Sequence, residues 1–155
     1  MNSEIKPTII VYLETARNSD LSLLYACHLA KKSNFAVQIL VVIESAKSLL
    51  FVSKAVGKDR RSEVKKQLKK LIEHAQRETD IVPAISIREG EVTREIAAEV
   101  KENPNCIMLV FGKSYNCQSD NNVFPKLSAQ IGNKIKVPVV IVPDNLGEEY
   151  LKKLF

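Results

Sequence analysis

The segment Ala36-Val37-Gln38-Ile39-Leu40-Val41-Val42-Ile43 contains a single polar residue, Gln38. A short apolar run that is rich in β-branched residues predicts a strand buried on both faces. Strands of this kind are typical of parallel sheets that helices cover on each side. We therefore expect an α/β fold built around this segment.

Four further apolar segments predict the other strands of the sheet, at residues 8–13, 82–87, 106–111 and 138–142. Pro83 lies at the start of the third strand and cannot donate a ladder hydrogen bond, which favours a position near the sheet edge. Apolar residues at helical spacing predict helices at about 18–33, 58–79, 92–103 and 124–134, with a short helix in the tail after residue 146. Residues 45–57 are interpreted as an irregular or short helical connection.

This alternation predicts an open, five-stranded, mostly parallel sheet with helices on both faces. No linker, repeat or low-complexity tract divides the chain, so we expect residues 1–155 to form a single domain. In such sheets, ligands bind outside the carboxyl ends of the strands, where the strand order reverses. The residues that follow the first strand (13–17) and the fourth strand (112–122) are therefore the place to look for a ligand.

Composition restricts the classes of partner. The formal net charge is +5, and the basic surplus is concentrated between Lys58 and Lys70, mostly on the polar faces of a predicted helix. Because no aromatic residue is interleaved with these lysines and the chain has no tryptophan, we expect no nucleic-acid partner.

No apolar run is long enough to cross a membrane, and the N-terminal residues lack the pattern of a secretion signal. Three widely spaced cysteines form no disulfide framework, which favours a cytoplasmic location.

The sequence offers little for catalysis. His28 and His74 lie in predicted helices, His28 partly buried beside the first strand and His74 on the solvent side, and spacing suggests no nucleophile or carboxylate partner for either. Cys27 and Cys106 lie in apolar surroundings, where cysteine acts as a small core residue. Cys117 lies in a polar loop, and a redox role for its thiol is left open. Metal-ligand spacing is absent, so we expect neither an enzyme nor a metal site.

Several segments, in this order, resemble the universal stress proteins over nearly the whole chain. They are Ile9–Glu14, the helix with Leu24, Ala26 and Ala30, Ile39–Ile43, Gly90 with Ile96, Cys106–Gly112 and Val137–Val142. The resemblance implies an adenine nucleotide alpha hydrolase-like fold with strand order 3-2-1-4-5. It also implies dimers that pair through the last strand.

In one subgroup of this family, ATP binds to a motif of glycine, two residues, glycine, nine residues, then glycine and serine or threonine. Laid on this chain, the motif falls on Gly112, Tyr115, Pro125 and Lys126, and only the first position is kept. A phosphate loop needs bare backbone with N–H groups, whereas a tyrosine adds a ring and a proline has no N–H. Each lost charged hydrogen bond costs roughly 1.5–3 kcal/mol, so we expect no ATP cofactor bound in the family's usual mode.

The resemblance implies further positions of the nucleotide site. Glu14 stands where the family's first strand normally ends in aspartate, and Val42 and Lys113 complete the set of candidate residues. Lys113 and Lys126 lie near the start of a predicted helix, where their charge can attract an anion even without the glycines.

Three hypotheses of function follow from this. The first is a non-enzymatic stress-response or regulatory module that acts as a homodimer through Pro138–Val142 and the apolar tail residues Tyr150, Leu151, Leu154 and Phe155. The alternative is an ATP- or AMP-binding switch or weak ATPase that uses Glu14, Val42 and Gly112. The third is that the crevice binds another small anion or metabolite.

Overall fold

Five parallel strands form one sheet in the order β3-β2-β1-β4-β5, as expected. The computed structural model of the chain describes residues 5–14, 21–44, 54–113, 123–143 and 145–155. The strands are β1 (Thr8–Tyr12), β2 (Ala36–Ile43), β3 (Ala84–Glu89), β4 (Cys106–Lys113) and β5 (Val139–Pro143). β3 and β5 are therefore the two edges, which confirms the position predicted from Pro83.

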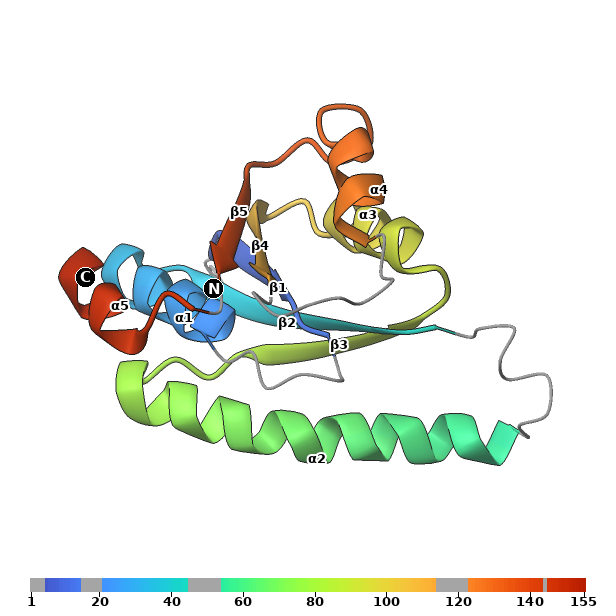
Figure 1. Cartoon of the computed structure of the whole chain (residues 1–155), viewed down its shortest axis with the longest axis horizontal. Helices are drawn as coiled ribbons and strands as arrows, with labels where there is room; N and C mark the ends of the chain where they lie inside the picture. Colours follow the sequence, from blue (N-terminus) through green and yellow to red (C-terminus); the bar gives the residue numbers. More distant parts are fainter. Residues whose placement is uncertain (1–4, 15–20, 45–53, 114–122, 144) are drawn as a thin grey trace.

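Helices cover both faces of the sheet (Figure 1). On one face lie α1 (Leu21–Ser33), α2 (Lys54–Thr79) and α5 (Glu148–Leu154). On the other lie α3 (Val92–Glu102) and α4 (Val123–Gln130). No helix among these described segments is long and apolar enough to cross a membrane.

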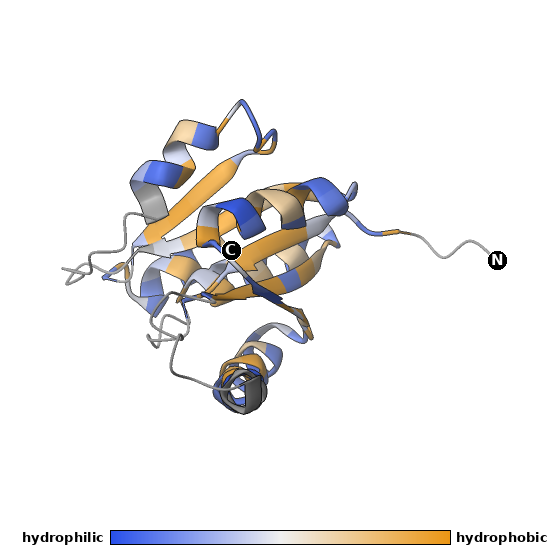
Figure 2. Ribbon diagram, turned by 90° about the vertical axis from the view of Figure 1, so that its right-hand side faces the viewer, coloured by the Kyte–Doolittle hydropathy of each residue, from blue (hydrophilic) through white to orange (hydrophobic). Residues whose placement is uncertain are grey.

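The central strand β1 shows why both faces must be covered. Ile9 and Val11 point into the core beneath α1 and α2, while Ile10 and Tyr12 point into the core beneath α3 and α4. All four are buried, and the apolar sheet lies between layers of mixed polarity (Figure 2). Burial of a large apolar side chain contributes roughly 1.5–3 kcal/mol, so a polar residue on either face of β1 would be costly.

A buried polar cluster fastens α3 to the edge of the sheet. Glu99 of α3 is 5% exposed and accepts hydrogen bonds from Gln38 Nε2 of β2 (2.9 Å) and Ser86 Oγ of β3 (2.7 Å). Arg88 of β3 pairs with Glu95 (2.9 Å) and Glu102 (2.8 Å) and lies 3.5 Å from Glu99. The buried carboxylate is thus neutralised and hydrogen-bonded, as a charge in a core requires.

Some element ends differ from the predictions. α4 ends at Gln130 rather than at residue 134, because the Gln130 carbonyl accepts the N–H groups of residues 133–135 and Gly132 takes a left-handed φ of +88°. β3 begins at Ala84, just after Pro83. α2 begins at Lys54, inside the segment interpreted as a connection. The N-capping residues proposed at 18–20 lie outside the described residues.

Candidate functional site

The predicted crevice begins where β1 and β4 end side by side. Tyr12, the last residue of β1, pairs with Leu40 of β2 and with Phe111 of β4. The rings of Tyr12 and Phe111 lie with centroids 5.2 Å apart and planes tilted by 44°. Both side chains are buried, so an aromatic pair forms a closed floor beneath the ends of the strands.

Carboxylates lie close to this floor. Burial raises the pKa of the Tyr12 phenol, and the negative charges of Glu14 and Glu44 raise it further. Glu14 follows β1 and Glu44 follows β2, so both carboxylates are at the carboxyl edge of the sheet. The phenol therefore stays protonated, with two negative charges in its surroundings.

Two of the predicted positions belong to the sheet itself. Val42 is buried near the end of β2, on the side covered by α3 and α4. Gly112 is half-buried in β4 and pairs with Val142 of the edge strand β5. Glu14, Val42 and Gly112 thus lie at the carboxyl ends of three adjacent strands, as the sequence predicts.

The other two described positions lie in the first turn of α4. Pro125 is exposed, and its missing N–H costs the helix no hydrogen bond, because N–H groups in a first turn have no partner within the helix, but a phosphate would lack that donor. Lys126 is also exposed, and its charge acts on Glu91 at the start of α3. The lysine therefore has a carboxylate nearby that offsets its attraction for an anion.

Glu91 was missed by the sequence analysis as part of this region. Its carboxylate caps α3, accepting from the backbone N–H groups of Thr93 (3.2 Å) and Arg94 (3.0 Å) and from Thr93 Oγ1 (2.8 Å). Burial raises its pKa, but these hydrogen bonds and the charge of Lys126 outweigh burial, so the pKa is lowered overall. Ser, Thr, Asp and Asn are the usual capping residues, so a glutamate gave little indication of this role.

A family model described as the universal stress protein family matches residues 7–143. The chain belongs to the universal stress protein family. The match covers every strand, including the ends of β1 and β4. No curated protein matches the chain by sequence.

Solved structures of universal stress proteins share the fold. UspA from Lactobacillus plantarum is 15% identical, with a TM-score of 0.69 over 91% of this chain and 99% of that one. A family member from Burkholderia pseudomallei is 15% identical, with a TM-score of 0.67 over 92% of this chain and 99% of that one. A universal stress protein from Archaeoglobus fulgidus, solved in complex with dAMP, is 16% identical, with a TM-score of 0.55 over 88% of this chain and 98% of that one. At these identities the likeness concerns the fold alone.

Parts of the predicted nucleotide site of this universal stress protein lie outside the described residues. Tyr115 is one of them, and Cys117, for which a redox role was left open, also lies outside the described residues. The backbone of Lys113 ends β4 opposite Pro143. The described structure therefore places Glu14, Val42, Gly112, Pro125 and Lys126.

The residues considered for catalysis lie elsewhere. Cys27 and Cys106 are buried, as expected, and burial raises the pKa of Cys27 to about 12 against a smaller lowering by a hydrogen bond with Thr79. His28 is half-buried, and its ring is stacked on Phe155 with centroids 5.8 Å apart. His74 was expected on the solvent side; its side chain is half-buried beside α5, with Nε2 3.4 Å from Glu148 Oε1. The described residues contain no group of His, Cys, Asp and Glu that could hold a metal ion.

Proposed function

We propose that this universal stress protein is a non-enzymatic stress-response or regulatory module that works in the cytoplasm as a homodimer and without ATP. The observation that carries the proposal is the replacement of three of the four motif positions by Tyr115, Pro125 and Lys126. The free, buried thiols of Cys27 and Cys106 are compatible with a reducing compartment.

The charges at the start of α4 support loss of ATP binding. The hydroxyl at this position in the family is replaced by Lys126, whose charge lowers the pKa of the Glu91 carboxyl. Glu14 and Glu44 add negative charge at the ends of β1 and β2. A triphosphate at this end of the sheet would have few backbone donors to offset repulsion by these carboxylates.

The edge strand β5 supports self-association. β5 hydrogen-bonds β4 on one side only, and Ile141 is 39% exposed. An unpaired strand edge with apolar side chains is a ready surface for a second copy related by a twofold axis. The role expected for Leu151 in this junction is wrong, because Leu151 is 1% exposed and packs in the core of its own chain. Tyr150, Leu154 and Phe155 remain exposed beyond it.

A thermal-shift titration with ATP and magnesium tests the first part of the proposal. A ligand at 100 times its dissociation constant adds about 2.7 kcal/mol to the free energy of unfolding, so binding would raise the melting temperature visibly. We expect no rise at millimolar ATP. The variant Tyr115→Gly/Pro125→Gly/Lys126→Ser restores the motif and should gain a rise that the natural chain lacks. A clear rise in the melting temperature of the natural chain would refute the proposed loss of ATP binding.

The alternative is a nucleotide switch that binds AMP or ATP in an altered way. Its support is that Glu14, Val42 and Gly112 keep their places at the strand ends and that the structurally similar protein from Archaeoglobus fulgidus was solved with dAMP. Equilibrium dialysis with AMP separates the alternatives, because AMP needs fewer phosphate contacts than ATP. Binding of AMP that is abolished by Gly112→Val would favour the switch over the proposal above.

Sedimentation analysis tests the homodimer. We expect a dimer at micromolar protein concentration, with little dependence on salt because the junction is apolar. A monomer at every salt concentration would refute the proposed homodimer, but it would not bear on the proposed loss of ATP binding.

A further inference from the structure

A cavity of about 520 Å³ lies at the end of the sheet opposite the crevice. Its walls are the C-terminal turns of α3, the first residue of β4 and the turn at 133–137 that leads into β5. The volume lies within the range of small-molecule sites. None of the residues predicted for the nucleotide site lines it, so it is a separate site.

The cavity carries an uncompensated positive charge. Lys101, Lys134 and Lys136 line it, and no aspartate or glutamate does. Among the described residues, none of these lysines forms an ion pair. The nearby carboxylates of α3 are already engaged, since Glu99 and Glu102 face Arg88. A concave surface concentrates the field of like charges and attracts an anion.

The end of α3 opposes an anion only weakly. A helix C-terminus carries roughly half a negative charge, which three ammonium groups outweigh. Two of the end carbonyls are also satisfied, because the Asn103 N–H donates to Val100 O (3.3 Å) and its side-chain Nδ2 donates to Glu99 O (2.7 Å). The field in the cavity is therefore positive.

The floor of the cavity is apolar. It is formed by Ala97, Val100, Cys106 and Val137, of which the first three are buried. Inorganic phosphate would satisfy the lysines but leave this floor facing water. A ligand that also carries a hydrocarbon or aromatic group would cover it, and apolar contact adds to affinity in proportion to the area removed from water.

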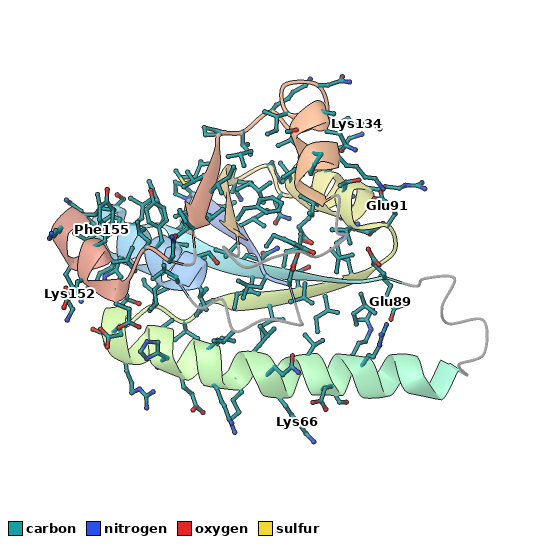
Figure 3. The ribbon with its side chains drawn as sticks, viewed as in Figure 1. Lys66, Glu89, Glu91, Lys134, Lys152 and Phe155 are labelled. Atoms are coloured by element: carbon teal, nitrogen blue, oxygen red, sulfur yellow. The ribbon has the colours of Figure 1, made fainter. Side chains whose placement is uncertain are left out.

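The backbone of the turn that carries Lys134 and Lys136 is held in place before any ligand arrives. Ile135 is fully buried in the core beneath α3 and α4. The Gln130 carbonyl accepts the N–H groups of Asn133, Lys134 and Ile135, and Gly132 N–H donates to Ile135 O (2.7 Å). Figure 3 shows Lys134 at the turn that follows α4. A turn tied down in this way needs little further ordering when it binds a ligand.

We propose that this cavity binds a small organic anion, a carboxylate joined to a short apolar body, with the lysines holding the carboxylate and the floor covering the body. The proposal does not depend on nucleotide binding or on dimerisation. It assigns a ligand class to the amino end of β4 and β5.

NMR titrations of the full ¹⁵N-labelled chain test the proposal with three probes. Benzoate has both a negative charge and an apolar ring. Benzamide has the ring without the charge, and inorganic phosphate has negative charge without an apolar group. We expect benzoate to shift the amide signals of residues 97–106 and 133–137 saturably, with a dissociation constant on the order of 1 mM for so small a ligand. Benzamide and phosphate should each bind at least about tenfold more weakly.

Three results would overturn the proposal. They are no saturable benzoate shifts up to tens of millimolar, benzamide binding as tightly as benzoate, or phosphate binding as tightly as benzoate. The last result would mean an adventitious ion only. All three are measured on the natural chain, so they do not depend on whether a variant folds.

A pair of charge-matched variants locates the site. Lys101→Ala/Lys134→Ala/Lys136→Ala removes the cavity charges, and we expect it to weaken benzoate binding at least about tenfold. Lys65→Ala/Lys66→Ala/Lys69→Ala removes the same charge from exposed positions of α2, where Lys66 points away from the sheet (Figure 3), and should leave binding unchanged. Equal weakening in both would mean a diffuse charge effect and would refute the site.

Discussion

At the scale of single residues, Gly90 between β3 and α3 is tightly constrained. Its φ is +149°, and a Cβ built there would lie 2.8 Å from Glu95 Oε2. Glu95 cannot easily move away, because its other carboxylate oxygen accepts from Arg88 Nε at 2.9 Å. Gly90→Ala should therefore lower the free energy of unfolding by at least about 2 kcal/mol, combining backbone strain with a displaced ion pair.

Gly132→Ala is the matched control for that measurement. Gly132 also has a positive φ, +88°, but nothing lies within 4 Å of its added Cβ. Gly132→Ala should therefore lower the free energy of unfolding only through backbone strain, by about 1 kcal/mol. Urea denaturation of both variants makes the comparison, and equal losses would show that the contact with Glu95 is unimportant.

Glu91 gives a prediction on pH at the same scale. Hydrogen bonds from Thr93 and Arg94 and the charge of Lys126 lower its pKa in the folded state despite burial. The carboxylate therefore adds stability above the ordinary pKa near 4.5, and this stability is lost as the pH falls through the lowered folded pKa.

Glu91→Gln keeps an acceptor oxygen and removes the charge, so it isolates this effect. The natural chain should be more stable than the variant at pH 7 by about 0.5–1 kcal/mol, the value of a cap assisted by charge at an exposed helix end. The difference should shrink at a pH below the ordinary value near 4.5. Urea midpoints at the two pH values test the expectation, and a difference that persists at low pH would contradict it.

At the scale of elements, the buried Glu99 decides how α3 is fixed to the sheet. Glu99→Ala would leave Gln38 and Ser86 without their acceptor and Arg88 with less counter-charge. Breaking such a buried cluster costs about 2–4 kcal/mol. Chemical denaturation should show this loss, together with faster amide exchange in α3.

Glu102→Ala is the control on the same helix and with the same arginine. Glu102 pairs with Arg88 at 2.8 Å, but its side chain is 62% exposed. An exposed ion pair contributes little to stability, so the variant should be nearly as stable as the natural chain. A larger loss for Glu102→Ala than for Glu99→Ala would mean that ion pairing with Arg88, rather than burial, holds α3.

At the scale of the whole molecule, the two sheet edges give a matched test of the dimer. Ile141 on β5 and Ile85 on β3 are 39% and 40% exposed, respectively. A lysine on an edge strand opposes pairing with another chain. Ile141→Lys should therefore convert the dimer to a folded monomer in sedimentation, whereas Ile85→Lys should leave it dimeric. Dissociation by Ile85→Lys alone would place the junction on the opposite edge.

The sequence predicted the fold well because strand and helix patterns are local. Apolar runs such as Ala36–Ile43 need burial on both faces, and helical periodicity between them leaves few arrangements other than a covered parallel sheet. The order of the strands came from the resemblance to a family and is confirmed. Helix ends were less predictable, since α4 stops where the backbone hydrogen bonds at Gln130 close a turn.

The sequence by itself determined which motif positions lack glycine, because a residue type is fixed before folding. Only the tertiary structure decided which charges meet. Lys126 acts on Glu91, which lies 35 residues earlier, and Lys101 shares a cavity with Lys134 and Lys136. The tertiary structure also decided that Leu151 packs in the core of its own chain. Contacts of this kind depend on how α3, α4 and α5 pack on the sheet, and no local pattern encodes that packing.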